Sequence, residues 1–327
     1  MASKMAAVLR AHPLLPAQVA RAVSYDKLNM LTPRQLLYAD SSENRRGITS
    51  FMDVDEDTIS ARRLKHLDGV REEVAAFAAS GAEGGELVAE CLKYVLEMDA
   101  GSSPTLFPNS PYPRDCDANG VRRDRVTASG EGMLLADFRS HPHATAARLT
   151  LVHVLVLRLY STAAFATINQ PLRAAMDKEA AAMAAAHPFP VTVMLLAEAI
   201  KKLRAVPAAV HGSGSEASTV ELWRGLRDAV VPEEFINGGG TEIAPMSTTR
   251  SLQVAMRYSA SAMPMLMRFK VGTFMQLGAD LGFVSAFPDE NEFLYPPLTY
   301  LQSVSTPAEL RVGDVTFTIV DVEPFIG

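Results

Sequence analysis

Cysteine is scarce in this sequence, which has only Cys91 and Cys116 among 327 residues. Two thiols cannot form a disulfide framework, and their separation is not that of a metal site, so we expect a reducing compartment and no bound metal. Long hydrophobic runs are missing as well. The longest, Leu149–Tyr160, is too short to cross a bilayer and contains His153 and Arg158. We therefore expect no membrane partner.

An excess of basic residues is also missing. The net charge is −6 and the isoelectric point is near 5.7, which argues against nucleic acid as a partner. The N-terminus is basic, with Lys4, Arg10 and Arg21 and no acid before Asp26. It lacks the uninterrupted apolar core of a secretory signal, so we expect a cytoplasmic protein, with an organelle transit peptide as the alternative.

Common nucleotide and catalytic motifs are absent. The glycines of "GSGSEA" and "NGGGTE" lack the G-x-G-x-x-G spacing between a strand and a helix, and no G-x-x-x-x-G-K-[ST] occurs. Neither H-E-x-x-H nor G-x-S-x-G is found. These absences exclude a doubly wound dinucleotide fold and a P-loop, and they disfavour a zinc protease and an α/β-hydrolase.

Helical patterns come first in the chain and strand patterns come last. Apolar spacing, alanine content and proline positions predict helices over 58–80, from about 86, and over 144–160, 168–186 and 191–206. Short β-prone segments bounded by turn residues predict strands over 220–226, 265–271, 293–304 and 315–325, with a glycine-rich loop over 235–243. This order is typical of an α+β protein rather than of alternating βαβ units.

A segment rich in proline, glycine and serine, 101–120, is the candidate boundary between two domains. We predict a largely helical N-terminal extension of unknown role over 1–130 and a second domain over 131–327. The apolar helices of the extension favour packing over disorder. It could be an autoinhibitory or targeting domain, or a helical layer packed on the second domain.

Two polar segments interrupt the strand-like region. "ELWRGL" carries Arg224, and an arginine in a short strand needs an anionic partner because its guanidinium stays charged. Taken alone, a surface arginine or an internal ion pair is the favoured interpretation. "APMSTTRS" carries Ser247, Thr248 and Thr249 in a row. Taken alone, these residues fit a helix N-cap and β-branched strand positions.

A third polar segment, "SAFPDENEFLYPP", holds Glu290 and Glu292. On a strand, residues i and i+2 share a face and lie about 6–7 Å apart, so the two carboxylates would face one site and Asn291 would point away. Pro288 and Pro296 argue against a helix here. Like charges at this distance raise each other's pKa. An acidic turn that caps an edge strand is the alternative interpretation.

The order of these segments resembles the arginine-type (R-S-E) mono-ADP-ribosyltransferase family. "LWRG", "STT" and "ENE" before "FLYPP" match its arginine, Ser-Thr-Ser and Glu-x-Glu series. "LRLYSTAAFATINQPLR", "FINGGGTEIAPMSTTRSLQVAMRYS" and "GADLGFVSAFPDENEFLYPP" are similar to its helical entry, its central loop and strand, and its substrate-recognition turn. The likeness covers about 137–327. It implies an ADP-ribosyltransferase fold, with two small packed sheets forming an NAD cleft after a helical subdomain.

The resemblance also implies NAD as cosubstrate and a role for each matched residue. Arg224 would contact the NAD phosphates, the backbone of Gly225 would approach the nicotinamide amide, and Ser247 would orient the catalytic carboxylate. Thr248 and Thr249 would line the nicotinamide-ribose pocket. The family's commoner motif is Ser-Thr-Ser, so Thr249 is a departure that keeps the hydroxyl group.

On the same basis Glu292 would be the catalytic glutamate, and Glu290 would bind the guanidinium of a protein or small-molecule acceptor. Phe287 would pack against that acceptor. The expected activity is transfer of ADP-ribose from NAD to arginine or a guanidino compound, with release of nicotinamide. The alternatives are an NAD glycohydrolase, which uses water as acceptor, and a non-catalytic NAD-binding or interaction module.

Overall fold

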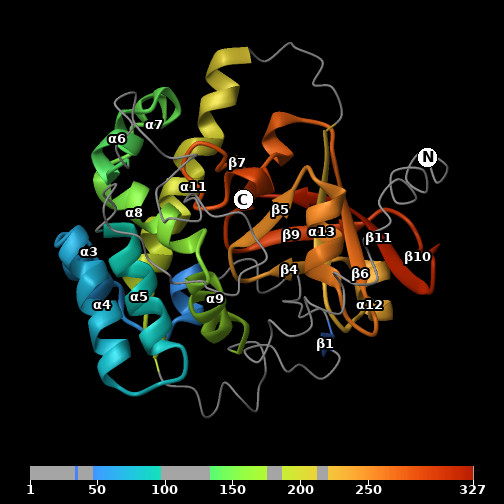
Figure 1. The fold of residues 1–327 in the computed structure, drawn as a ribbon, viewed down its shortest axis with the longest axis horizontal. Helices are drawn as coiled ribbons and strands as arrows, with labels where there is room; N and C mark the ends of the chain where they lie inside the picture. The colour runs from blue at the N-terminus through green and yellow to red at the C-terminus, as the bar shows by residue number, and fades with distance from the viewer. Residues whose placement is uncertain (1–33, 36–46, 97–132, 175–185, 212–219, 327) are drawn as a thin grey trace, which may run out of the picture.

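The computed structural model describes residues 34–35, 47–96, 133–174, 186–211 and 220–326. Apart from the short strand β1 (Arg34–Gln35), which pairs with β3 (Ala229–Val230), helices fill these ranges up to residue 211 and strands dominate after residue 220, so the predicted α+β class is confirmed. The helices up to α11 lie on one side of the molecule and most strands lie on the other (Figure 1). The helices of the first part are α3 (Glu56–Arg63), α4 (Leu67–Ala79), α5 (Gly85–Leu96), α6 (Leu135–Ser140), α7 (Pro142–Ala146), α8 (Leu151–Tyr160), α9 (Ala164–Ala174) and α11 (Pro190–His211).

Nine strands form one hydrogen-bonded sheet in the order β4-β9-β11-β6-β2-β5-β8-β7, with β10 paired to β11. A single residue pair, Trp223 with Thr249, joins β2 to β5. The two packed sheets that the resemblance implies are therefore continuous at one point. The strands are β2 (Val220–Leu226), β4 (Gly240–Glu242), β5 (Met246–Thr249), β6 (Met265–Val271), β7 (Ala279–Asp280), β8 (Glu292–Tyr295), β9 (Thr299–Ser303), β10 (Ala308–Val312) and β11 (Val315–Phe325).

Two predicted helices are each broken by a residue with positive φ. His66 has φ 54° and separates α3 from α4, so the single helix predicted over 58–80 is wrong. Arg148 has φ 53° and separates α7 from α8, which corrects the helix predicted over 144–160. Apolar spacing runs through both breaks because residues on either side enter the same core, so the pattern alone does not reveal them.

The predicted strands over 220–226, 265–271 and 315–325 are confirmed as β2, β6 and β11. The segment 293–304 forms two strands, β8 and β9, because the pair Pro296-Pro297 cannot donate to a ladder. The loop predicted over 235–243 is wrong, since it contains the end of α12 (Glu233–Gly238) and β4. The proline-rich segment 101–120 lies outside the described residues, so the boundary at residue 130 stays a prediction.

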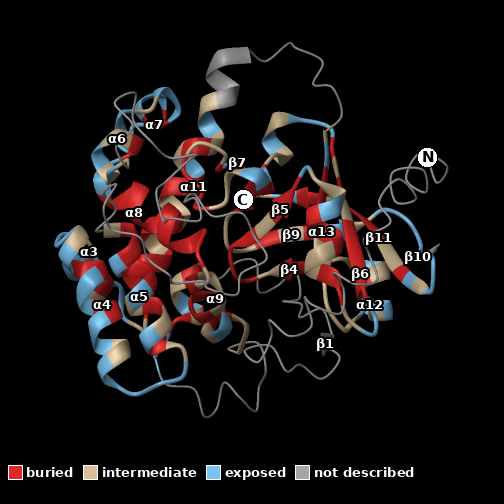
Figure 2. Ribbon diagram, in the orientation of Figure 1, coloured by how far each residue is buried: buried red, intermediate tan, exposed pale blue. Residues whose placement is uncertain are grey.

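Helices from before and after that segment share one hydrophobic core. Val70, Val88 and Val95 of α4 and α5 belong to the same buried cluster as Leu155 of α8 and Leu196 of α11. Buried positions line the inner faces of these helices and run on into the central strands (Figure 2). The helices of 56–96 thus pack on the elements that carry the candidate site.

Within the described ranges, no single helix has the length and hydropathy of a membrane span. One bent pair of helices, α8 and α9 at 86° to each other, has the length and composition of a span when the two are taken together.

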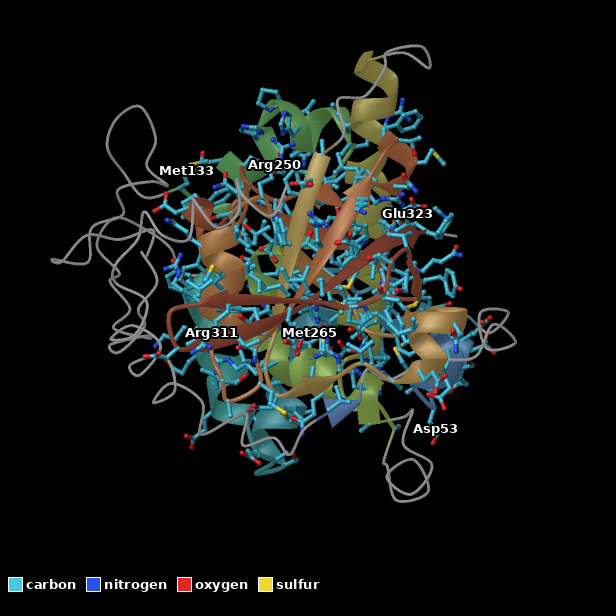
Figure 3. The ribbon with its side chains drawn as sticks, turned by 90° about the vertical axis from the view of Figure 1, so that its right-hand side faces the viewer. Asp53, Met133, Arg250, Met265, Arg311 and Glu323 are labelled. Atoms are coloured by element: carbon cyan, nitrogen blue, oxygen red, sulfur yellow. The ribbon has the colours of Figure 1, made fainter. Side chains whose placement is uncertain are left out.

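Helix α13 (Leu252–Ser259) connects β5 to β6. Figure 3 labels Arg250, just after β5, and Met265, at the start of β6.

Candidate active site

Arg224, Ser247 and Glu292 come from the adjacent strands β2, β5 and β8 and are linked by hydrogen bonds. The hydroxyl of Ser247 donates to Glu292 Oε1 at 2.6 Å. The guanidinium of Arg224 donates from Nη1 to the carbonyl oxygen of Ser247 at 3.1 Å. Arg224 and Glu292 are 68 positions apart in the sequence, and the order of β2, β5 and β8 in the sheet brings them together.

Glu290 does not share a strand with Glu292, which corrects the geometry expected from their spacing. Pro288 begins a 3₁₀ turn, Pro288–Glu290, and Asn291 follows with φ 47° before β8 begins at Glu292. Proline suits the first position of such a turn because its missing N–H would have no partner there. Both carboxylates are nevertheless buried, at 9% and 7% exposure, and Asn291 is exposed as expected.

The two carboxylates titrate well above the ordinary range of glutamate. Burial raises the pKa of Glu292 to about 7, although hydrogen bonds from Ser247 and Ser285 oppose the shift. Burial, and then the charge of Glu292, raises the pKa of Glu290 to about 8. Carboxylates whose pKa values are raised by burial and by a like charge are characteristic of functional sites.

Thr248 and Thr249, the two remaining predicted residues of β5, make hydrogen bonds to the backbone. Thr248 is buried and donates its hydroxyl to the carbonyl oxygen of Phe293 at 2.9 Å. Thr249 donates to the carbonyl oxygen of Glu290 at 2.5 Å and accepts from the amide of Ser251 at 2.9 Å. These bonds hold the 3₁₀ turn and the start of α13 against β5. A role of either threonine in a ribose pocket stays a prediction.

Gly225 lies where β2 packs against α13. A Cβ atom at this position would stand 1.9 Å from the carbonyl oxygen of Ala255 and 2.7 Å from the amide nitrogen of Ser259. The missing side chain is therefore required by the packing of the helix on the strand. The expected approach of the Gly225 backbone to nicotinamide stays a prediction.

Phe287 comes immediately before the 3₁₀ turn, and its amide donates to Ser285 Oγ at 3.1 Å. The ring is half-buried against the helical core. Part of the Phe287 ring stays accessible, just before the turn that holds Glu290. Contact of this ring with an acceptor stays a prediction.

Glu242, which the sequence analysis did not select, is the anionic partner that Arg224 requires. Its Oε2 lies 3.5 Å from Arg224 Nη2, and Arg173 of α9 binds both carboxylate oxygens, at 3.1 and 3.3 Å. Burial alone would raise the pKa of Glu242, but the charges of Arg173 and Arg224 outweigh it and hold that pKa below its ordinary value. Two guanidiniums share one carboxylate, so one positive charge is left beside Ser247.

A second unselected group fixes the start of β5. The hydroxyl of Tyr160 donates to the carbonyl oxygen of Pro245 at 2.8 Å, and Asn169 Nδ2 donates to the Tyr160 oxygen at 2.9 Å and to the same carbonyl at 3.2 Å. Both residues lie in "LRLYSTAAFATINQPLR", the segment matched as a helical entry. The match of this segment to the family was the sequence signal that could have indicated Tyr160 and Asn169.

We expect Glu242→Gln to lower the free energy of unfolding by about 3 kcal/mol, because removal of one partner of a buried ion pair leaves uncompensated charge. Here Arg173 and Arg224 would repel each other across a neutral amide. Denaturant unfolding measures the change, with the exposed Glu309 as matched control: Glu309→Gln should stay within about 0.5 kcal/mol of wild type. Equal stability of the two variants would contradict the ion-pair argument.

Comparisons with known proteins give structural likenesses only. No protein-family model matches the sequence, and no curated protein matches it. Among solved structures, the chain is similar to the ADP-ribosyltransferase HopU1 of Pseudomonas syringae pv. tomato, at 15% identity over 73% of this chain and 97% of that chain, with a TM-score of 0.40. It is also similar to the eukaryotic mono-ADP-ribosyltransferase ART2.2, at 13% identity over 79% and 86% of the two chains, with a TM-score of 0.35.

A third likeness is to exoenzyme S of Pseudomonas aeruginosa, solved with human 14-3-3 protein beta and carba-NAD. Its identity is 18% over 57% of this chain and 86% of that chain, with a TM-score of 0.35. Similarities of this size do not establish a family or an activity. The functional argument therefore depends on the side chains of the site.

The site combines two chemical properties. The guanidiniums of Arg173 and Arg224 share the single carboxylate of Glu242, and the positive charge that is left over suits a phosphate group. Glu292 accepts a hydrogen bond from Ser247, Glu290 lies close enough to respond to the charge of Glu292, and the two carboxylates can stabilise a cation. Within the part of the chain that the structure describes, no group of three or more His, Cys, Asp or Glu side chains could hold a metal ion.

Proposed function

We propose that this protein is a mono-ADP-ribosyltransferase that transfers ADP-ribose from NAD to arginine or another guanidino compound. The observation that carries the proposal is the hydrogen-bonded series from Arg224 through Ser247 to Glu292, with Glu290 buried beside it. The order of these residues in the sequence matches the R-S-E series, and independent strands bring them to one place. The acceptor is a protein side chain or a small guanidino molecule, and we propose a cytoplasmic location.

Charge supports NAD as the substrate. Its diphosphate would take the positive charge that Glu242 leaves uncompensated on Arg173 and Arg224, through charge-assisted bonds. That contact would direct the rest of the molecule across Ser247 towards the carboxylates. The residues present therefore fit a dinucleotide without a glycine-rich phosphate loop.

The proposed reaction breaks the bond between ribose C1′ and the nicotinamide nitrogen, and nicotinamide leaves with the electron pair. The ribose then has oxocarbenium character, as in glycoside hydrolysis. Glu292, held by Ser247 at 2.6 Å, would bond the ribose 2′-hydroxyl and stabilise the positive charge more in the transition state than in the ground state. A guanidino nitrogen forms the new bond to C1′, and its proton passes to Glu290 or to water.

The experiment that tests this function incubates purified protein with NAD and agmatine and measures free nicotinamide and ADP-ribosylagmatine. Formation of both at equal rates would support arginine-type transfer. Nicotinamide and ADP-ribose without the adduct would identify an NAD glycohydrolase. Absence of nicotinamide release across pH 6–9, together with measurable NAD binding, would identify a non-catalytic NAD-binding module and would overturn the proposal.

We expect Glu290→Ala to separate transfer from hydrolysis. Loss of the acceptor carboxylate should reduce ADP-ribosylagmatine formation by about 10²-fold, the lower range for removal of a positioned general base, while much of the NAD hydrolysis is retained. Both products are measured in the same reaction, and exposed Asp289→Ala is the matched control from the same turn. An equal loss of both activities would contradict the separate role of Glu290.

A further inference from the structure

Tyr258, on the last turn of α13, bonds directly to the carboxylate of Glu290. Its phenolic hydroxyl donates to Glu290 Oε1 at 3.0 Å. Among the described residues it is the one hydrogen-bond donor to that carboxylate. Ala255 and Met256 of the same helix are buried against Trp223 of β2, so the helix that carries the phenol is fixed on the sheet.

The chemical nature of this donor distinguishes Glu290 from Glu242 and Asp321, two carboxylates that also have little exposure to solvent. Glu242 and Asp321 are held by guanidiniums or by an ammonium group, which neutralise them. A phenol is neutral at physiological pH, so it fixes Glu290 and leaves its negative charge intact. A cation in the same place would compete with a guanidinium acceptor, whereas Tyr258 does not.

The bond also leaves room for the acceptor. Tyr258 occupies one lone pair of Oε1, so Oε2 and the second lone pair of Oε1 remain for guanidinium N–H groups. The charged and titratable groups that face Glu290 are Glu292 of β8 and the neighbouring Arg257 and Tyr258 of α13. Glu292 opposes ionisation of Glu290, while Arg257 and the phenol favour it.

We propose that Tyr258 is a positioning residue for the acceptor: it orients the Glu290 carboxylate towards a cationic guanidino group without neutralising that carboxylate. The inference rests on the proposed function and adds a determinant of acceptor specificity to it. Nothing in the sequence singles out Tyr258, since an aromatic residue at this helical position would fit a core contact equally.

Tyr258→Phe tests the proposal, because phenylalanine keeps the ring and removes only the hydroxyl. Transfer to agmatine should fall about tenfold at pH 7, corresponding to one lost hydrogen bond to a charged group, while NAD hydrolysis changes less. The bond lowers the pKa of Glu290, so its loss should move the rising limb of the transfer profile to higher pH. Transfer by the variant should then recover partly at pH 9.

Tyr300→Phe is the matched control. Tyr300 lies on β9, which is far from β8 in the sheet order, and its hydroxyl donates to the carbonyl oxygen of Gly238. A Tyr258→Phe profile that coincides with wild type and with this control would overturn the inference. So would an equal fall in transfer and hydrolysis at every pH, which would indicate a structural role.

A second measurement keeps the inference separate from the proposed function. With ¹³C-labelled glutamate, NMR titration of the Glu290 carboxyl group, assigned by its loss in Glu290→Gln, should give a higher apparent pKa in Tyr258→Phe than in wild type. This result is expected even if the protein releases no nicotinamide, in which case the proposed function fails and the Tyr258 contact stands. An unchanged titration would overturn the contact itself.

Discussion

Glu292→Gln should reduce nicotinamide release from NAD by about 10³-fold, the upper range for loss of one preorganised electrostatic group. Glutamine keeps the size of the side chain and can still bond Ser247, which donates to Glu292 Oε1 at 2.6 Å. What it loses is the negative charge that would face the ribose cation. Because that charge acts mainly in the transition state, kcat should fall far more than KM rises.

Glu292→Gln should also keep the stability of the folded protein, so that a loss of activity can be assigned to the lost charge. The pKa of Glu292 in the folded protein, about 7, lies above its ordinary value of 4.5. The native state therefore holds this proton more tightly than the unfolded state does, and its contribution to stability is lost as pH rises through about 7. Glutamine cannot ionise, so Glu292→Gln should be at least as stable as wild type at pH 8. Thermal unfolding at pH 5.5 and pH 8 measures this difference.

Nicotinamide release is measured for wild type, Glu292→Gln and the surface control Glu309→Gln under the same conditions. Equal rates in wild type and Glu292→Gln would end the assignment of Glu292 as the catalytic carboxylate. The wild-type rate should rise with pH as the pair ionises. Because Glu290 and Glu292 interact, the apparent pKa values of that profile belong to the pair rather than to either residue.

The sequence predicted which residues come together at the site better than it predicted their local geometry. The pairing of Glu290 and Glu292 was expected from a strand, where i and i+2 share a face, yet Glu290 lies in a 3₁₀ turn and Asn291 has φ 47°. Both carboxylates become buried because the turn is held to β5 by Thr249. The strand pattern therefore predicted correctly that the two carboxylates lie close together, but the 3₁₀ turn, and not a shared strand face, is what places them.

Contacts between distant segments could not be predicted from the sequence. Arg224 was expected to need an anion, but nothing in "GGGTEI" indicates that Glu242, 18 residues later, supplies it together with Arg173. The role of Tyr258 could not be predicted either, since its partner Glu290 lies in a turn 32 residues away. Side chains that make such contacts have ordinary neighbours in the sequence, and the fold alone brings them together.

Gly225→Ala should be strongly destabilising, with a loss of about 4 kcal/mol or more in the free energy of unfolding. The added Cβ would stand 1.9 Å from the carbonyl oxygen of Ala255 and 2.7 Å from the amide of Ser259. Both neighbours are backbone atoms of α13 or its end, so no rotamer change relieves the clash. The helix must move away from β2, and Tyr258 must move with it.

Gly238→Ala is the matched control, because a Cβ at the end of α12 meets no atom within 4 Å. It should unfold within about 0.5 kcal/mol of wild type. Denaturant unfolding compares the three proteins, and the yield of soluble protein is recorded where Gly225→Ala does not fold. If Gly225→Ala folds with wild-type stability yet loses NAD binding, the glycine serves the dinucleotide rather than the helix. Because the clash is with α13, we expect stability to be lost first and the site to fail as a consequence.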